Sequence, residues 1–377
     1  MKTMLYCQHS IGMGHLIRTL RLAEASLENG PVRLICGGEI PAKLQIDARI
    51  QVDALPPLIA RPDNTLADPH SASTVQQILQ QRCEQSLAAV NDFEPDALIV
   101  EMFPFGRKKF ADEILGLIKA ARDVSNASIF SSVRDVLVTS RRDQTRYEQR
   151  VVGWLNRHFD ALLIHADPRL VTLNATFSDF SKIEVPTYYT GYISSSESPT
   201  VTERDQTVVV SAGGGRVGQI LIDAAINAWP EIKTELGLDM LVVTGPMSKG
   251  RAASANSRAE PKKVRFLENM PEVLGRSSLS ISQCGYNTAI DVLKAQIPAV
   301  FVPFETASED EQLRRAALLA GCGRSITLRE FALNPRSLTR AARQALAVMK
   351  ERDLAAKVDL DGARCSRKIV NEWRGNA

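Results

Sequence analysis

Polar residues of types that bind ligands follow two neighbouring apolar runs in the second half of the chain. The sequence GYNTAID at 285–291 follows the run at 279–282, and EDEQ at 309–312 follows the run at 299–304. Each apolar run predicts a strand, and each polar stretch opens into a helix-forming sequence. Because ligands of open α/β sheets bind outside the carboxyl ends of the strands, we expect one ligand site here. Its expected residues are Gly285, Asn287, Thr288, Asp291, Glu311 and Gln312.

The side chains of this expected site differ in how specifically they indicate a ligand. Asp291 lies among aliphatic neighbours, where a carboxylate is costly unless it meets a partner. A ribose diol is one such partner, and an ion pair with a nearby Arg or Lys is the alternative. The acidic residues at 309–311 favour the first turn of a helix in any case. Gln312 has no such explanation, so it carries more weight.

The turn after the first predicted strand of the second half is rich in glycine. It holds Gly213, Gly214 and Gly215, followed by Arg216. Glycines let backbone N–H groups approach a phosphate, and a following helix N-terminus adds a favourable dipole. A plain tight turn rarely needs three glycines, so we expect this loop to bind a phosphate group.

Another glycine turn follows the first predicted strand of the chain and leads into His15. It holds Gly12 and Gly14, but Ile17 replaces the third glycine of the dinucleotide-binding pattern G-x-G-x-x-G. A Walker A loop is absent. His15 lies in the first turn of the expected helix, whose dipole lowers the histidine pKa and favours a neutral base. A purely structural role for this histidine is the alternative.

The alternation of apolar runs and helical stretches predicts an α/β fold with parallel sheets, in two halves. The Ser/Thr-rich stretch 191–204 has no apolar periodicity and reads as a linker. We expect a Rossmann-like domain at 1–190, a second at 205–355, and a tail helix at 356–377 that packs back on the first. Expected strands lie at 4–7, 32–36, 50–54, 97–100, 128–132, 161–165, 187–190, 207–212, 240–244, 264–267, 279–282 and 299–303. Expected helices lie at 16–28, 74–91, 110–124, 143–157, 338–348 and 363–373.

Composition limits the class of protein. The net charge of +3 is too small to indicate nucleic-acid binding. The six cysteines have no metal-ligand spacing, so buried reduced thiols and a cytoplasmic location are expected. No apolar run approaches the length of a membrane span. The D-x-D sequence at 359–361 reads as a solvated turn in the charged tail, and we expect no metal and no cofactor.

These residues resemble those of the GT-B superfamily of glycosyltransferases. More narrowly, the chain is similar to the MurG-like group of family 28, which adds N-acetylglucosamine to a lipid-linked muramyl-pentapeptide. The likeness is denser in the second half. It includes 282–291, similar to the family's nucleotide-sugar helix, 266–270, similar to the segment that reads the base, and 303–312, similar to the segment that binds donor-sugar hydroxyls. The glycine loop at 213–215 matches the diphosphate loop.

Three stretches look closer to a related branch of predicted bacterial glycosyltransferases. They lie at 101–107, 132–135 and 309–316. Two of them belong to the first half, which recognises the acceptor in this superfamily. The resemblance therefore specifies the donor class and leaves the acceptor open.

The resemblance implies a GT-B fold of two Rossmann-like domains facing across a cleft. It implies an inverting, metal-independent transfer of a sugar from a nucleotide-sugar, with a UDP-sugar favoured, to a hydroxyl acceptor. The catalytic base is then His15, with Glu101 or Asp135 as competing candidates. On the donor side it implies Leu267 at the base, Asp291 at the ribose and Arg216 near the diphosphate. On the acceptor side it implies a loop with Gly12, Gly14, Arg107 and Arg134.

Other functions stay open. The sequence GMGHLIR at 12–18 also resembles the loop of the sugar-nucleotide hydrolase of pseudaminic acid synthesis, so a nucleotide-sugar hydrolase or epimerase is one alternative. A non-catalytic sugar-nucleotide-binding protein is another. The basic clusters at 107–109 and 141–142 are interpreted first as a solvated charged face. The alternative is peripheral contact with the inner face of a membrane that carries a lipid-linked acceptor.

Overall fold

The computed structural model describes residues 1–9, 13–42, 44–61, 65–70, 73–195, 203–214, 217–245, 260–267, 269–307, 309–323, 325–351 and 358–373. The chain divides into two compact units. Unit 1 comprises Met1–Asp135, Asp143–Ile193 and Asp361–Ala377, and unit 2 comprises Val136–Arg142 and Ser194–Leu360.

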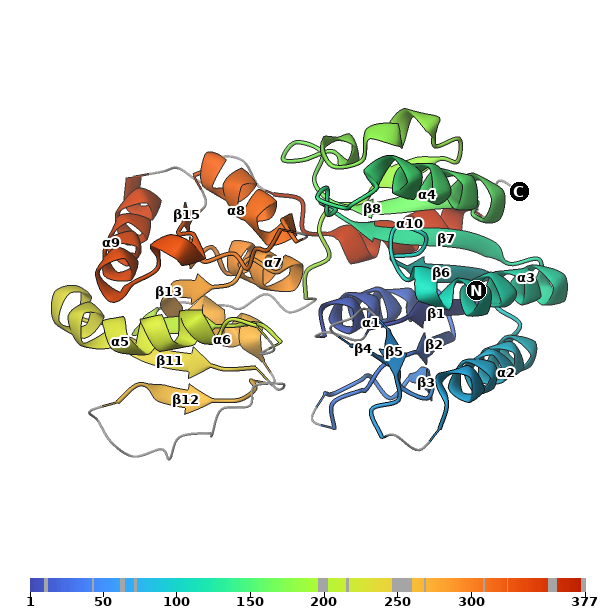
Figure 1. The fold of residues 1–377 in the computed structure, drawn as a ribbon, viewed down its shortest axis with the longest axis horizontal. Coiled ribbons are helices and arrows are strands. Elements are labelled where there is room, and N and C mark those ends of the chain that lie inside the picture. The colour runs from blue at the N-terminus through green and yellow to red at the C-terminus, as the bar shows by residue number, and fades with distance from the viewer. Residues whose placement is uncertain are drawn as a thin grey trace. The chain divides into compact units, whose positions relative to one another are not determined.

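Unit 1 is built on a seven-stranded, all-parallel sheet in the order β3-β2-β1-β6-β7-β8-β9 (Figure 1). Its strands are β1 (Thr3–Cys7), β2 (Val32–Cys36), β3 (Ile50–Ala54), β6 (Ala97–Glu101), β7 (Ser128–Arg134), β8 (Ala161–His165) and β9 (Thr187–Tyr189). Its helices are α1 (Gly14–Ser26), α2 (Val75–Phe93), α3 (Ala111–Ser125), α4 (Gln144–His158) and α10 (Gly362–Trp373). Short 3₁₀ helices lie at Lys108–Phe110, Leu173–Ala175 and Ser178–Lys182, and a small hairpin pairs β4 (Ile59–Ala60) with β5 (Leu66–Ala67).

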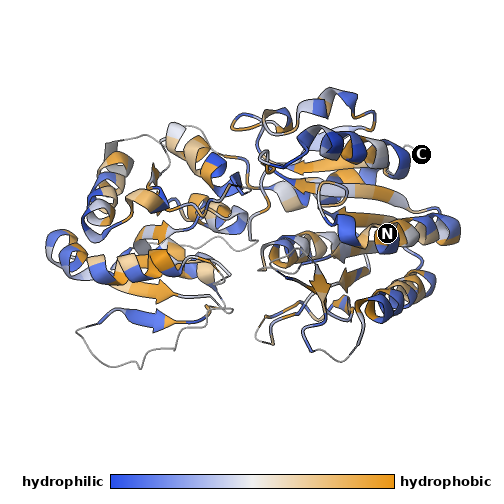
Figure 2. Cartoon of the chain, viewed as in Figure 1, coloured by the Kyte–Doolittle hydropathy of each residue, from blue (hydrophilic) through white to orange (hydrophobic). Residues whose placement is uncertain are grey.

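The strands of unit 1 form because their residues are apolar on both faces of the sheet. β1, β2, β6 and β8 are buried along their whole length, as expected for a parallel sheet covered by helices on both sides. Figure 2 shows these strands as hydrophobic ribbons flanked by helices of mixed polarity. Only the carboxyl ends of such strands leave room for functional polar groups.

The C-terminal helix α10 belongs to unit 1, although it follows all of unit 2 in the chain. It packs against α1, and Val370 is buried in the same core as Leu16 and Leu20. The Trp373 ring contacts the rings of Phe130 and Tyr188 edge-on, with centroids 5.7 and 6.3 Å away. The end of the chain therefore completes the hydrophobic core of unit 1.

Unit 2 has a six-stranded, all-parallel sheet in the order β12-β11-β10-β13-β14-β15. Its strands are β10 (Asp205–Ser211), β11 (Asp239–Val243), β12 (Lys262–Val264), β13 (Ser277–Ser282), β14 (Ala299–Phe301) and β15 (Ile326–Thr327). Its helices are α5 (Gln219–Leu236), α6 (Met270–Arg276), α7 (Tyr286–Ala295), α8 (Glu311–Gly321) and α9 (Pro335–Glu351), with a 3₁₀ helix at Glu330–Ala332.

Each sheet has a point where the direction of winding reverses. In unit 1 the chain leaves β1 toward β2 and β3, and then returns to place β6 on the other side of β1. In unit 2 the same reversal separates β10 from β13. The crevice outside such a switch point is the usual ligand site of an open α/β sheet. The fold therefore offers one such crevice in each unit.

The segment Val136–Arg142 belongs to unit 2, although it directly follows β7. Thr139 donates from its backbone N–H and its hydroxyl to the carboxylate of Asp310, over 3.3 and 2.8 Å. Arg314 donates to the Thr139 hydroxyl over 2.6 Å and to Asp310 over 2.7 Å. This segment is therefore fixed to the start of α8.

The sequence predicts most elements closely and misplaces a few. The α/β class with two parallel sheets is confirmed. The strand expected at 264–267 is wrong, because β12 covers Lys262–Val264, whose polar residues hide an edge strand from a hydrophobicity pattern. Of the cysteines, Cys322 is exposed rather than buried. None of the helices in the described ranges is long and apolar enough to cross a membrane.

Candidate functional site

The switch point of unit 1 brings His15 and Glu101 together. His15 is the second residue of α1, directly after β1, and Glu101 is the last residue of β6. The His15 Nδ1 atom lies 3.0 Å from Glu101 Oε1. Glu101 is 1% exposed, whereas the His15 side chain keeps 18% of its surface open. A buried carboxylate therefore holds a histidine whose ring reaches solvent.

The partners of Glu101 fix the tautomer of His15. An ionised carboxylate only accepts hydrogen bonds, so the contact with Glu101 requires His15 Nδ1 to carry the hydrogen. The Arg18 guanidinium lies 3.1 Å from the same nitrogen and can only donate, and in this tautomer its N–H is directed to the Glu101 carboxylate. Arg18, one turn along α1, pairs with the same oxygen of Glu101. Within the described part of the chain, His15 Nε2 has no hydrogen-bond partner. In the neutral ring Nε2 holds the lone pair, so the geometry offers a base on the open side.

The charges around this pair keep the histidine neutral. Burial lowers the pKa of His15 well below its usual value, and the nearby Arg107 charge lowers it further. Burial alone would raise the pKa of Glu101, but Arg18 and the hydrogen bonds from His15 and Ser132 hold it well below its usual value. The sequence predicted the direction for His15 from the helix dipole, and the structure assigns the shift mainly to burial and Arg107.

Three polar residues that sequence reasoning missed continue from Glu101 along the sheet edge. Ser132 Oγ donates to Glu101 Oε2 over 2.6 Å. His165 Nε2 lies 2.8 Å from Ser132 Oγ, and His165 Nδ1 lies 2.9 Å from Thr190 Oγ1. All three side chains are fully buried. Their only sequence signal is a polar residue at the end of an apolar run, which is a weak pattern.

The remaining residues predicted for unit 1 surround this pair. Arg107 has a left-handed backbone (φ 62°) before the 3₁₀ helix Lys108–Phe110. Burial lowers its pKa, and its charge interacts with Glu101 and Arg134. Asp135 is fully buried just after β7, and Glu101 is the carboxylate that contacts the His15 ring. Gly14 begins α1.

The switch point of unit 2 is lined by glycine rather than by charge. Gly213 follows β10 with φ +61°, and Gly285 is the N-cap of α7 after β13. A Cβ built on either glycine would meet no atom of the described residues within 4 Å. Gly285 has an ordinary extended backbone (φ −64°, ψ 152°), so neither packing nor conformation requires glycine there. Open space in front of a helix N-terminus is what an anionic ligand needs.

Polar atoms beside this space have no hydrogen-bond partner within the described residues. They are the Gln283 amide nitrogen and the Ser282 hydroxyl, on residues that are 4% and 0% exposed. Gly218, the N-cap of α5, has φ +101°, and a Cβ there would approach Gln283 Nε2 to 2.9 Å. Buried polar groups normally find partners, so these atoms mark a place for a ligand or water. Sequence reasoning did not single out Gln283, because an isolated glutamine carries no pattern.

Helix α7 carries three of the residues predicted for the donor. Asn287 and Thr288 lie half-buried in its first turn, and Asp291 lies one turn further with 7% of its surface exposed. Arg315 of α8 fixes the start of this helix, because it donates to the Cys284 carbonyl over 2.9 Å and lies over the Tyr286 ring. The two helices therefore hold one another in place.

The residues predicted to bind the donor sugar lie at the start of α8. The expected first turn is partly wrong, because Glu309 lies before the helix and Asp310 is its N-cap. Asp310 accepts from Thr139 and Arg314 instead of capping α8. Glu311 is paired with Arg315 over 2.7 Å. Gln312 Oε1 accepts the backbone N–H of Phe304 over 3.1 Å, and its amide NH₂ group has no hydrogen bond to any of the described residues.

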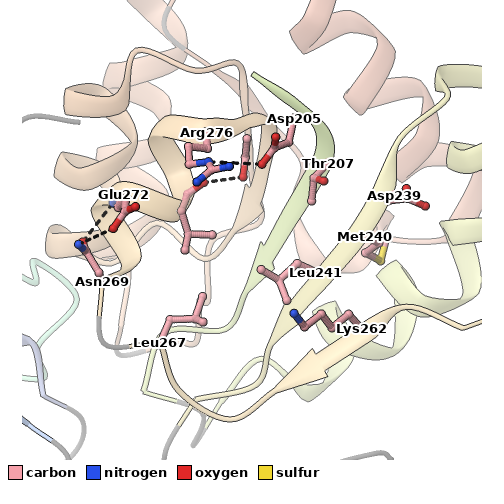
Figure 3. A pocket seen from close by; sticks show the side chains of 12 residues that line it. Asp205, Thr207, Asp239, Met240, Leu241, Lys262, Leu267, Asn269, Glu272 and Arg276 are labelled. Carbon is pink, nitrogen blue, oxygen red and sulfur yellow. Dashed lines mark hydrogen bonds and ion pairs between the residues drawn. The ribbon is translucent and has the colours of Figure 1, made fainter. Parts of the chain in front are cut away.

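A pocket of about 410 Å³ lies elsewhere in unit 2, between α6 and the sheet (Figure 3). Asp205, Asp239, Lys262 and Ser277 line it, and each is the first residue of its strand. Leu267, predicted at the base of the nucleotide, also points into it. The pocket therefore includes the amino ends of four strands, and its lining contains none of the glycines of the glycine turns. We look for the ligand site of unit 2 at the carboxyl ends, where open α/β sheets bind their ligands.

Part of the predicted site lies outside the described residues. This holds for Gly12, Gly215 and Arg216; Gly214 is described and half-buried after Gly213. In the described ranges, no three His, Cys, Asp or Glu side chains gather in a way that would hold a metal ion. Independence from metals stays a prediction.

Comparison with known protein families identifies unit 2. Residues 207–359 match the glycosyltransferase family 28 C-terminal domain. A UDP-N-acetylglucosamine–N-acetylmuramyl-(pentapeptide) pyrophosphoryl-undecaprenol N-acetylglucosamine transferase of an Exiguobacterium species is 31% identical over 147 residues, which are 38% of this chain and 40% of that protein. The protein of the same name from Carboxydothermus hydrogenoformans is 28% identical over 130 residues, 34% of this chain and 35% of its own. The chain thus matches about two fifths of the length of these curated relatives.

Solved structures with the same fold cover nearly the whole chain. Acinetobacter baumannii MurG has a TM-score of 0.56 at 14% identity and covers 98% of this chain and 99% of its own. The calicheamicin glycosyltransferase CalG4 has a TM-score of 0.62 at 14% identity, with 99% and 98% covered. TcCGT1 in complex with UDP has a TM-score of 0.63 at 13% identity, with 100% and 99% covered. At these identities the likeness shows the fold alone, and it confirms the predicted GT-B fold class. The predicted resemblance to family 28 is confirmed for residues 207–359.

Proposed function

We propose that this chain, which has a family 28 glycosyltransferase C-terminal domain on a GT-B fold, transfers a sugar from a nucleotide-sugar to an acceptor hydroxyl. A UDP-sugar is the favoured donor, because the curated relatives are named for a UDP-N-acetylglucosamine reaction. The transfer proceeds with inversion and without a metal ion. The observation that carries the proposal is the buried Glu101 carboxylate that presents His15 as a neutral base.

Unit 1 supplies the base in this mechanism. His15 Nε2 takes the proton of the acceptor hydroxyl while the acceptor oxygen bonds to the anomeric carbon. The imidazolium that forms is stabilised by the Glu101 carboxylate, which already holds Nδ1–H over 3.0 Å. The bond from the anomeric carbon to the diphosphate breaks on the opposite face, and its electron pair leaves with the nucleotide. A single displacement of this kind inverts the anomeric centre.

Unit 2 binds the donor in this mechanism. The open space at Gly213 and Gly285 and the N-terminus of α7 accommodate the diphosphate, whose developing charge the backbone N–H groups stabilise. Asp291 accepts from the ribose hydroxyls, and the free NH₂ of Gln312 donates to a sugar hydroxyl. Gln283 supplies a further donor near the diphosphate, which sequence reasoning did not include.

The acceptor is a hydroxyl compound that unit 1 recognises. The relatives are named for a pyrophosphoryl-undecaprenol acceptor, so a lipid-linked acceptor belongs to the proposal, together with peripheral contact with a membrane. Of the two basic clusters predicted for that contact, Lys108, Lys109 and Arg142 are exposed, whereas Arg107 turns toward His15. Co-sedimentation with anionic vesicles at low and high salt tests the contact, which should weaken as salt screens the charges.

The test of the proposed function is a donor screen followed by an assay. UDP-, GDP-, ADP- and dTDP-sugars are compared for their effect on the melting temperature, because a ligand that binds the folded state raises it. The stabilising donor is then incubated with candidate acceptors in the presence of EDTA, and the anomer of the product is read by NMR. We expect transfer with inversion that EDTA does not abolish. Stoichiometric sugar release without an acceptor would favour the hydrolase, and binding without turnover would favour a non-catalytic protein.

A further inference from the structure

A chain of hydrogen bonds follows the carboxyl edge of the unit 1 sheet across five adjacent strands. The strands β1, β6, β7, β8 and β9 are neighbours in that order. His15 follows β1, Glu101 ends β6, Ser132 lies near the end of β7, His165 ends β8, and Thr190 follows β9. Each side chain contacts the next over 3.0, 2.6, 2.8 and 2.9 Å. The side chains beyond Glu101 are fully buried.

The direction of every hydrogen bond in this chain is determined by its chemistry. Glu101 is ionised and only accepts, so Ser132 must donate its single hydroxyl hydrogen to Glu101. Ser132 Oγ then accepts from His165, so His165 Nε2 carries the hydrogen. His165 is neutral, because burial lowers its pKa to about 3. Its Nδ1 therefore accepts, and Thr190 donates to it over 2.9 Å in competition with the Gly191 and Ile164 carbonyls, which lie 3.0 and 3.3 Å from the same hydroxyl.

We infer that Ser132, His165 and Thr190 are positioning residues that lock the Glu101 carboxylate and so keep His15 in the tautomer whose Nε2 receives the acceptor proton. The inference rests on the proposed function, and it assigns a role to three residues that touch no reacting atom. Without Ser132, one oxygen of Glu101 loses its partner and the carboxylate can rotate away from His15. A misplacement of about 1 Å can cost on the order of a hundredfold in rate.

Other charged and titratable groups near Glu101 are already fixed. Arg18 pairs with the same oxygen that His15 contacts. The Arg107 charge interacts with Glu101, and burial and the Glu101 charge raise the pKa of Cys7 so that its thiol stays neutral. These groups are unchanged when Ser132 or His165 is replaced. A change in the behaviour of His15 then reports on the hydrogen-bond chain.

The protein offers a matched control for Ser132 on the same strand. Ser131 is also fully buried and donates its hydroxyl hydrogen over 2.7 Å, but to the carbonyl of Phe103 instead of to Glu101. Ser131→Ala and Ser132→Ala therefore delete the same atom at the same depth. Only the second deletion interrupts the chain. His165→Leu interrupts it one residue further, and His165→Gln restores an N–H donor to Ser132.

The experiment measures both kcat across pH and the ring state of His15 by NMR in the full-length protein. In Ser132→Ala and His165→Leu we expect kcat to fall about tenfold to a hundredfold at unchanged donor KM. Without the hydrogen bond from Ser132, the Glu101 carboxylate stabilises the protonated form of His15 more strongly, so the pKa of His15 rises. The acidic limb of the kcat profile, where His15 becomes protonated, therefore moves to higher pH. We also expect the Nδ1–H tautomer of His15 to lose population. Ser131→Ala and His165→Gln should stay close to wild type in these readouts.

Two results would overturn the inference. One is an equal effect of Ser131→Ala and Ser132→Ala on kcat and its pH profile, and the other is an unchanged His15 tautomer in Ser132→Ala and His165→Leu. Failure of the proposed function looks different, because the wild-type protein would then transfer sugar from no donor, or His15→Ala would transfer it as fast as the wild type. In that case the NMR readout still tests the chain, since it requires no turnover.

Discussion

The two switch points of this molecule have the same topology and opposite chemistry. At the first, charged and polar side chains from β1, β6, β7, β8 and the turn after β9 satisfy one another in a buried network. At the second, Gly213 and Gly285 leave open space, and the buried Gln283 amide lacks a partner among the described residues. A site that performs proton transfer must be preorganised, whereas a site that binds a large ligand must be incomplete without it. In the proposed function, this difference corresponds to chemistry in unit 1 and donor binding in unit 2.

The largest expected effect comes from breaking the pair in unit 1. Glu101→Gln removes the charge that stabilises the imidazolium, and its amide no longer requires His15 Nδ1 to carry the hydrogen. We expect kcat to fall by about 10²–10⁴, with little change in the affinity for UDP, as measured by steady-state kinetics and calorimetry. A loss of UDP affinity as large as the loss of kcat would show that catalysis and donor binding are not separated between the two switch points.

As the pH is lowered, unit 1 is expected to lose stability at a higher pH than unit 2. His15 and His165 have lowered pKa values in the folded state, so below pH 6.5 the unfolded chain binds protons that the folded chain excludes. Stability then falls with pH by about 1.4 kcal/mol per unit for each histidine, until the folded pKa is reached. Protonation of the Glu101 carboxylate lowers the free energy of unfolding only at still lower pH. Its stabilising charge is lost only as the pH falls through its own pKa, which lies well below the usual value.

Hydrogen exchange followed by mass spectrometry checks this order. Peptides from β1, β6 and β8 should lose protection at a higher pH than peptides from β10 and β13. Simultaneous loss in both units, or earlier loss in unit 2, would contradict the assignment of the pH-sensitive groups to unit 1.

A smaller effect is expected from filling the open space in unit 2. Gly285→Ala puts a methyl group where the structure has nothing within 4 Å, so the free energy of unfolding should change by less than about 1 kcal/mol. A donor that uses this space meets the methyl group, and donor KM should rise about tenfold or more. The matched control is Gly237→Ala at the C-cap of α5.

Gly237 also faces open space, but its φ is +69°. Its replacement by Ala should cost about 1 kcal/mol of stability and leave donor KM unchanged. Thermal unfolding and donor kinetics of Gly285→Ala and Gly237→Ala show whether each substitution changes stability, donor KM or both. A donor KM that Gly285→Ala leaves unaltered would remove this glycine from the donor site.

The smallest expected effect comes from Gln283. Gln283→Leu replaces a buried amide whose nitrogen has no partner in the described part of the chain, so the protein without donor should be no less stable. If the amide donates to the donor substrate, its loss should raise donor KM about three- to tenfold. A large loss of stability at unchanged KM would instead show a structural role.

The sequence predicts the fold better than the site for a physical reason. Long apolar runs such as 97–101 and 161–165 record local burial, so strands and parallel sheets follow from periodicity alone. The edge strand β12, with two lysines, carries no such signal. His15, Glu101 and Gly285 were found because each follows an apolar run in a glycine turn or at a strand end. The order of the strands in the sheet was not predicted, and it is this order that brings Ser132 and His165 to Glu101.

For the individual donor residues, too, the sequence predicts the position of a polar residue but not its contacts. Glu311 and Gln312 are neighbours in sequence, yet Glu311 forms an ion pair with Arg315, while Gln312 contacts the Phe304 backbone through its amide oxygen. This difference depends on a partner one turn along α8 and on the backbone of Phe304. A single sequence records neither contact, because both depend on how helix and loop pack in three dimensions.

In the proposed mechanism, unit 1 performs the chemistry and unit 2 binds the donor. UDP affinity and kcat measured on one preparation of His15→Ala separate these two roles. We expect a UDP dissociation constant within about twofold of wild type and a kcat lower by about a hundredfold or more. An unchanged kcat, or a UDP affinity that falls together with kcat, would contradict it.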